Sequence, residues 1–146
     1  MKMLVVKLLL GAFILAELQY GTMGRTGRWL LDFGLLIICK TRTNPLRFNG
    51  YGCYCGSGGK GQPVDSLDRC CQVHDECYGS VERRFGVGTL TTYVTPYFFN
   101  PLTCQCTTQL TDIQYALCLC DATAAACFRR SPYHAQFSGY NKERYC

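Results

Sequence analysis

The sequence predicts a small, mainly α-helical, disulfide-rich domain in which disulfides cross-link two long antiparallel helices. A short N-terminal helix, a glycine-rich loop and a small β-hairpin wing complete the predicted fold. Twelve of the 146 residues are cysteines, a frequency typical of small domains held together by disulfides. Two segments, at 66–83 and about 108–128, predict long helices, the first from a capping aspartate at its start and the second from apolar residues at helical spacing. The stretch 49–61 is so dense in glycine that it predicts a loop.

The first 21 residues predict an export signal. Lys2 and Lys7 come before an apolar run from Leu8 to Ala16, which has roughly the 7 to 15 residues of a signal-peptide core. A buried helix is the alternative, but the run is too short to span a bilayer, which needs roughly 20 residues. We expect a signal peptide at 1–21, a possible propeptide at 22–28, and one secreted, extracellular domain at 29–146 without a transmembrane anchor.

The charge of the chain argues against nucleic-acid binding. Fifteen Lys and Arg residues against ten Asp and Glu residues give a formal net charge of +5. Residues 1–28 hold four of the basic residues and one of the acidic ones, so 11 and 9 remain and the domain carries +2. Nucleic-acid binding usually needs a concentrated basic face. The pairs Arg83-Arg84 and Arg129-Arg130 are expected on solvated helix faces, with contact to anionic lipid as the alternative.

The cysteines predict six disulfides if the chain is exported. A zinc site is the rival interpretation. The cysteines at 53 and 55, 70 and 71, 104 and 106, and 118 and 120 lack the spacing of two intervening residues that structural zinc sites prefer. With bridges in place, a domain of this size needs no large hydrophobic core.

The element before the loop is predicted to be a short helix at 29–38. Its apolar residues recur at helical spacing, at positions 29, 30, 33, 36 and 37. Gly34 and the pair Ile37-Ile38 are poor helix formers. Asn44-Pro45 ends any helix that reaches it.

The first long helix is predicted at 66–83. Asp65 can cap its N-terminus, and Asp68 lies where a carboxylate favours the first turn. Glycines at 86 and 88 end it, and the Thr-rich and aromatic segment Thr89 to Phe99 predicts a small hairpin or an irregular loop. Leu110 and the residues that follow it at helical spacing predict the second helix, and the tail is expected to be loop-like.

Cysteine spacing relates the two long helices to each other. Cys70, His74 and Cys77 stand at i, i+4 and i+7, so they share one stripe of the first helix. Cys120 and Cys127 are also seven residues apart on the second helix. If Cys70 pairs with Cys127 and Cys77 with Cys120, both bridges fit the same register of two antiparallel helices. His74 would then lie between two staples roughly 10 Å apart.

This register brings a carboxylate close to the histidine. Asp121 follows Cys120 and would lie within about one helical turn of His74. A histidine held beside a carboxylate in a rigid frame has the geometry of a general base oriented by an acid. A surface histidine with an acid nearby by chance is the alternative.

The glycine-rich loop from Tyr51 to Gly61 suggests a cation site. Its glycines let backbone carbonyls converge, and its cysteines can fix it in place. Calcium takes about 6 to 8 oxygen ligands, and Asp75, directly after His74, could supply a carboxylate. A flexible surface loop or a phosphate cradle is the alternative, although no P-loop lysine and serine follow.

Two strings carry a specific resemblance. They are Tyr51-Gly52-Cys53-Tyr54-Cys55-Gly56 and Cys70-Cys71-Gln72-Val73-His74-Asp75-Glu76-Cys77-Tyr78. Together with Cys118-Leu119-Cys120-Asp121, Cys127 and the terminal cysteine, they closely resemble the secreted phospholipase A2 family. The resemblance covers essentially all of the chain after Arg28.

The resemblance implies a calcium site and a catalytic pair. It implies that one Ca2+ is bound by the carbonyls of Tyr54, Gly56 and Gly58 and by both carboxylate oxygens of Asp75.

It also implies that His74 deprotonates a water that attacks the sn-2 ester of a glycerophospholipid. Asp121 would orient His74, and Tyr78 and Tyr97 would hydrogen-bond Asp121. Calcium and the Gly56 amide would stabilise the oxyanion.

The family's cysteine pairing can be carried over to this chain. The implied bridges are Cys39–Cys104, Cys53–Cys146, Cys55–Cys71, Cys70–Cys127, Cys77–Cys120 and Cys106–Cys118. A bridge like Cys39–Cys104 is a feature of the pancreatic-type, group I-like subgroup. Two departures stand out: Val87 and Ile113 lie near the places of a usual family bridge, and Asp32 stands where the family commonly has glutamine.

The implied function is calcium-dependent hydrolysis of phospholipids to lysophospholipid and fatty acid, at a membrane or micelle surface. A non-catalytic phospholipase A2-like binding protein or toxin is the alternative; such members typically lose the histidine or the metal carboxylate. An unrelated disulfide-rich module would need no His-Asp pair between stapled helices. No receptor can be inferred.

The basic connector suggests an activation step. It ends in Arg28, and family-like sequence begins at Trp29, so cleavage after Arg28 would free a helix whose Trp29, Leu30 and Phe33 could lie against lipid. Removal of the whole leader by signal peptidase alone is the alternative.

Overall fold

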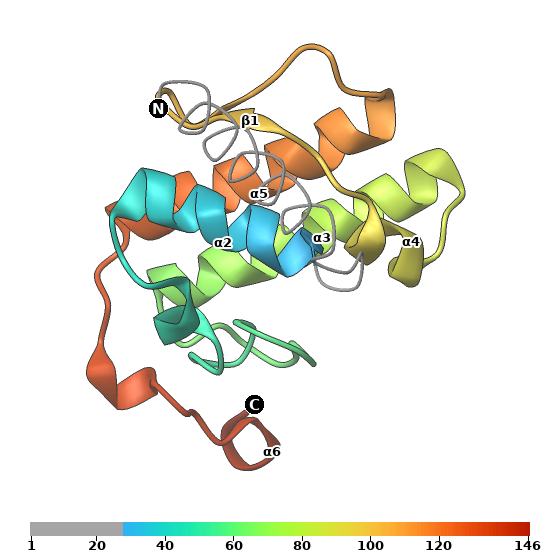
Figure 1. Cartoon of the computed structure of the whole chain (residues 1–146). Coiled ribbons are helices and arrows are strands. Elements are labelled where there is room, and N and C mark those ends of the chain that lie inside the picture. The colour runs from blue at the N-terminus through green and yellow to red at the C-terminus, as the bar shows by residue number, and fades with distance from the viewer. Residues whose placement is uncertain (1–27) are drawn as a thin grey trace, which may run out of the picture.

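The computed structural model describes residues 28–146, and their side chains from Leu31 onward. The expectations for residues 1–27, and for the side chains of Trp29 and Leu30, lie outside the described part. Two long antiparallel helices, α3 and α5, form its centre, and α2 lies across them (Figure 1). The mainly helical, disulfide-rich fold predicted from the sequence is confirmed.

Helix α3 spans Ser66–Phe85 and α5 spans Asp112–Arg130. Asp65 caps α3 as expected, because its carboxylate accepts a hydrogen bond from the Asp68 N–H. Gly86 ends α3 in the left-handed conformation, with φ of 63°. Helix α5 begins four residues later than the expected 108, since Thr111 and Gln114 form a capping box there.

Helix α2 spans Arg28–Thr41 and packs against α5. It buries Leu36 and Ile37, and partly buries Phe33. It runs three residues beyond the expected end at 38, because burial of Ile37 in the core outweighs the low helix propensity of the pair Ile37-Ile38. A short 3-10 helix, η1 (Pro45–Phe48), follows, with Asn44 as its cap.

The segment after α3 differs from the prediction. Instead of a hairpin or an irregular loop from 89, it opens with helix α4, Thr89–Val94. The buried Thr92 hydroxyl bonds the Thr89 carbonyl, which satisfies a β-branched residue inside the helix. The predicted hairpin lies further on: β1 (Phe99–Asn100) pairs antiparallel with β2 (Gln105–Cys106).

Six disulfides use all twelve cysteines, and they pair as the family resemblance implied. The bridges are Cys39–Cys104, Cys53–Cys146, Cys55–Cys71, Cys70–Cys127, Cys77–Cys120 and Cys106–Cys118. No cysteine of the described chain is free. Two bridges join α3 to α5 in the antiparallel register that the cysteine spacing predicted.

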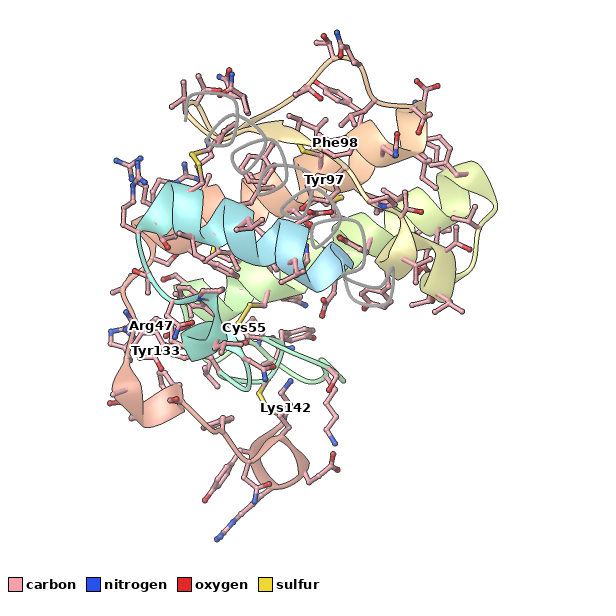
Figure 2. The ribbon with its side chains drawn as sticks, in the orientation of Figure 1. Arg47, Cys55, Tyr97, Phe98, Tyr133 and Lys142 are labelled. Atoms are coloured by element: carbon pink, nitrogen blue, oxygen red, sulfur yellow. A yellow bond between two sulfur atoms is a disulfide. The ribbon has the colours of Figure 1, made fainter. Side chains whose placement is uncertain are left out.

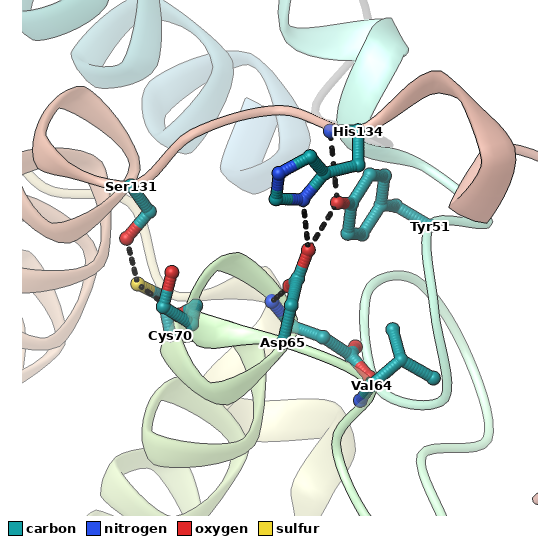
Figure 3. A network of polar contacts seen from close by, with 8 residues as sticks. Tyr51, Val64, Asp65, Cys70, Ser131 and His134 are labelled. Atoms are coloured by element: carbon teal, nitrogen blue, oxygen red, sulfur yellow. Dashed lines mark hydrogen bonds and ion pairs between the residues drawn. The ribbon is translucent and has the colours of Figure 1, made fainter.

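The tail is more ordered than the expected loop. It contains the 3-10 helix η2 (Ala135–Phe137) and a last turn, α6 (Lys142–Tyr145). Asp65, at the start of α3, links the tail to the glycine loop: its carboxylate accepts a bond from the Tyr51 hydroxyl at 2.5 Å and lies 3.0 Å from His134 Nδ1 (Figure 3). The tail therefore packs on the outside of the loop.

Among the described residues, none of the helices is both long and apolar enough to cross a bilayer.

Candidate active site

His74 lies on α3 between the two disulfides that join α3 to α5. Its Nε2 is 2.6 Å from Oδ1 of Asp121 on α5. The Phe33 ring stacks on the imidazole at a centroid distance of 4.5 Å, and the Tyr78 ring packs at 4.8 Å. The side chain keeps only 16% of its surface exposed, so packing fixes the ring and leaves a small part of it open to solvent.

Asp121 is fully buried, and both of its carboxylate oxygens accept hydrogen bonds. Tyr78 donates to Oδ1 at 3.0 Å, and Tyr97 donates to Oδ2. Tyr97 comes from the irregular stretch between α4 and β1, and it lies over the centre of the molecule in Figure 2. A buried carboxylate is costly unless it is paired and hydrogen-bonded. Here His74 and Tyr78 from α3 and Tyr97 from the stretch before β1 satisfy it.

The two tyrosines remain protonated donors. Burial, followed by the negative charge of Asp121, raises the pKa of Tyr78 and of Tyr97 far above the usual tyrosine range. Asp32 on α2 also raises both pKa values through its charge. The residue that stands in place of the family's usual glutamine is therefore a second carboxylate near the His74–Asp121 pair.

The start of the glycine loop is fixed by Asp68, which the sequence indicated only as a first-turn carboxylate. This fully buried side chain accepts backbone N–H bonds from Cys53, Tyr54 and Val64, all at 2.8 to 2.9 Å. A Cβ on Gly52 would come within 2.6 Å of the Asp68 carboxylate atoms. The sequence carries no pattern that indicates this role, because the bonded groups lie 4 to 15 residues away from Asp68 and are ordinary backbone N–H groups.

Asp75 follows His74 and faces the loop. A Cβ built on Gly59 would lie 2.8 Å from Asp75 Oδ2 and 2.6 Å from the Tyr54 ring, so only glycine lets the backbone approach this carboxylate. Burial raises the pKa of Asp75, against the opposing charges of His74 and Lys142. Gly56 and Gly58 adopt positive φ values of 93° and 74°, which glycine tolerates.

The oxygen atoms of the Asp75 carboxylate and of the glycine loop are suited to a hard cation. The residues described by the structure contain no group of three or more His, Cys, Asp or Glu side chains that could hold a metal. A cation here would instead be held by one carboxylate and by carbonyls of the loop that carries Tyr54, Gly56 and Gly58. Carbonyl and carboxylate oxygens are the ligands that calcium takes, whereas zinc prefers nitrogen and sulfur.

Comparison with known proteins identifies the fold and its chemistry. Residues 30–138 match the family described as phospholipase A2. The chain belongs to the phospholipase A2 family. Its sequence is 42% identical, over 116 residues, to a basic phospholipase A2 from Micrurus corallinus; the alignment covers 79% of this chain and 80% of that protein. It is 48% identical, over 105 residues, to an acidic phospholipase A2 from Micrurus dumerilii, covering 71% and 88%.

Membership of the phospholipase A2 family settles the class of reaction. The chain is a secreted-type phospholipase A2, which hydrolyses the sn-2 ester of glycerophospholipids to lysophospholipid and fatty acid. The family is generally calcium-dependent and acts at lipid interfaces. The roles of individual residues are a separate question.

Proposed function

We propose that His74 is the general base of this hydrolysis and that Asp121 orients it. The 2.6 Å contact between His74 Nε2 and Asp121 Oδ1 carries the proposal. If Nε2 donates its proton to the carboxylate, Nδ1 is left as the acceptor that takes a proton from a water. Asp121 then stabilises the positive imidazolium that results, as a buried carboxylate does in other His-Asp pairs.

Tyr78 and Tyr97 act through Asp121. Because their raised pKa values keep both hydroxyls protonated, they donate to the carboxylate at any working pH. Asp121 is thereby held as an acceptor for the imidazole and in one orientation. The stack of Phe33 on His74 excludes water from one face of the ring.

We also propose that Asp75 and the carbonyls of Tyr54, Gly56 and Gly58 hold one Ca2+ per active site. When bound, the ion supplies positive charge to the oxyanion that forms as the ester carbonyl is attacked. The Gly56 N–H would donate to the same oxyanion. The close approach of Gly59 to Asp75 supports this assignment, because it brings the loop backbone to the carboxylate of the residue directly after His74.

The substrate surface would be met at α2. Leu31, Leu35 and Ile38 recur at i, i+4 and i+7 and are 43% to 51% exposed, so they form an apolar stripe on this helix. Leu46 on η1 is 75% exposed. This stripe suits peripheral contact with a phospholipid membrane or micelle, in the extracellular space that the leader implies.

The test is fatty-acid release from defined phospholipid vesicles, with and without calcium. The parent protein should release fatty acid only with calcium, and His74→Gln should lose about 10²- to 10⁴-fold of this turnover, the usual contribution of a general base. Circular dichroism provides the folding control. Equal turnover in a folded His74→Gln protein would remove His74 from the mechanism.

A further inference from the structure

The C-terminal segment is bonded along the outside of the glycine loop. The Gly52 N–H donates to the Phe137 carbonyl at 2.9 Å, and the Cys53–Cys146 disulfide ties the end of the chain to the loop. A Cβ on Gly61 would meet the Cys146 carbonyl oxygen at 2.2 Å. The loop and the last turn, α6, therefore form one packed unit.

One side chain of this turn reaches the loop backbone itself. Lys142 Nζ donates to the Cys55 carbonyl at 3.2 Å and to the Ser57 carbonyl at 3.0 Å. Figure 2 shows Lys142 below the loop that carries Cys55. The neighbouring residue, Glu143, instead pairs with Lys60 at 2.8 Å. The Lys60 side chain is 44% exposed and the Glu143 side chain is 88% exposed. Lys142 is thus the cation of α6 that touches the loop carbonyls, while Glu143 makes a surface ion pair.

The two carbonyls that Lys142 holds determine the direction of two amides. A trans peptide is planar, with its C=O and N–H pointing in opposite directions. Holding the Cys55 carbonyl toward Lys142 therefore turns the Gly56 N–H away from it, and holding the Ser57 carbonyl does the same for the Gly58 N–H. Glycines at positive φ allow peptide planes to rotate readily. The Gly50 N–H also donates to the Cys55 carbonyl, at 3.1 Å, so Lys142 adds a second donor to that plane and supplies the donor to the Ser57 carbonyl.

We infer that Lys142 is a positioning residue: from the C-terminal turn it helps to fix the Cys55–Gly56 and Ser57–Gly58 peptide planes, which carry the Gly56 N–H and lie on either side of the Gly56 carbonyl. This inference rests on the proposed function, in which the carbonyls of Tyr54, Gly56 and Gly58 bind calcium. Lys142 donates to the carbonyls of Cys55 and Ser57, which alternate along the loop with the proposed calcium ligands. It acts on the metal and on the oxyanion through the backbone, without touching either.

Lys142 also has an opposing effect, because a positive charge near the site repels calcium. The two effects differ in their response to salt. At about 0.5 M KCl the Debye length is roughly 4 Å, which screens a charge beyond that distance but leaves direct hydrogen bonds in place. A change in calcium affinity measured at this salt concentration therefore reports the loss of the hydrogen bonds from Lys142 to the loop, and not the loss of its charge.

The experiment compares four proteins by calorimetry with CaCl2 in about 0.5 M KCl: the parent, Lys142→Met, Lys142→Arg and Glu143→Gln. Lys142→Met keeps the aliphatic stem and loses the donor, and should bind calcium about tenfold more weakly, as expected for lost hydrogen bonds to a charged group. Lys142→Arg keeps a charged donor and should lie within about threefold of the parent. Glu143→Gln, the matched control on the same turn, should bind like the parent.

A second readout separates positioning from general stability. With a short-chain phospholipid below its critical micelle concentration and saturating calcium, Lys142→Met should lower kcat more than it raises KM, because the Gly56 N–H serves the transition state. Equal calcium affinity in Lys142→Met and the parent, or equally weak binding in Lys142→Arg and Lys142→Met, would overturn the inference. A parent protein that binds no calcium would overturn the proposed function itself.

Discussion

The two halves of the site are held in different ways. The His74–Asp121 pair lies in the core between α3 and α5, where two disulfides flank it and three donors fill the buried carboxylate. The glycine loop lies at the surface, with Gly56 and Gly58 exposed. Its shape depends on hydrogen bonds that its N–H groups donate to Asp68 and that Lys142 of the tail donates to its carbonyls. The base is thus fixed by two bridges between helices and by packing. The Cys53–Cys146 and Cys55–Cys71 bridges anchor the first part of the loop, but its exposed part is held by polar contacts to its backbone.

Because the two halves are held differently, substitutions in them should have different effects. A change in the core should affect stability and catalysis together, because the same contacts serve both. A change behind the loop should affect calcium affinity while leaving the fold intact, because few apolar contacts are involved there.

Removal of the bridge beside the base should have the largest effect. Cys77→Ala with Cys120→Ala opens a loop of 43 residues and should cost about 2 to 4 kcal/mol of unfolding free energy, the range typical of native disulfides. Chemical denaturation measures this loss. As a matched control, Cys106→Ala with Cys118→Ala removes a bridge over only 12 residues, on the hairpin side, and should reduce turnover less. If the two double variants lost turnover equally, the flanking bridge would have no special role at His74.

Gly59→Ala should separate the loop from the core. The added methyl would meet Asp75 Oδ2 at 2.8 Å and displace it, so calcium affinity should fall by about tenfold, or ~1.4 kcal/mol. The melting temperature should change little. Gly88→Ala is the control, since nothing lies within 4 Å of a Cβ there. Unchanged calcium affinity in Gly59→Ala would mean that Asp75 is not placed by this close approach.

The smallest effect is expected at Asp65, which joins the loop to the tail. Burial raises its pKa, but hydrogen bonds from the Asp68 N–H, His134 and Tyr51 outweigh burial, and the pKa lies below its usual value. A lowered folded-state pKa contributes stability that is present above the unfolded value of about 3.9 and is lost as pH falls through the folded value. Asp65→Asn should therefore lower the melting temperature at pH 7, with the difference shrinking in acid below about pH 4. A difference independent of pH would show that charge plays no part.

The sequence predicted the His74–Asp121 half of the site well, because the patterns that predict it lie within short segments of the chain. Helical period and the seven-residue spacing of cysteines are properties of short segments, and they place His74 beside Asp121 once the helices are antiparallel. Tyr97 could not be placed from the residues alone, since it lies in an irregular stretch with no period. The resemblance to the family named it.

The loop half was harder to predict from the sequence. The glycines indicated a loop, but not that Asp68 would fix its start or that Lys142 would reach its carbonyls from 85 to 87 residues away. These are long-range polar contacts of ordinary residue types, which leave no pattern in the sequence. Helix α4 was missed for a related reason: its threonines favour strands, and tertiary contacts such as that of Thr92 outweigh this preference.

The most direct test of the separation between base and loop is the calcium affinity of His74→Gln and Asp75→Asn, measured by calorimetry on the same day and in the same buffer. These residues are adjacent on α3, so a non-specific disturbance of the helix would affect both variants alike. We expect His74→Gln to bind calcium like the parent while losing turnover, and Asp75→Asn to lose calcium binding and turnover together. Normal calcium affinity in Asp75→Asn, or its loss in His74→Gln, would contradict the account.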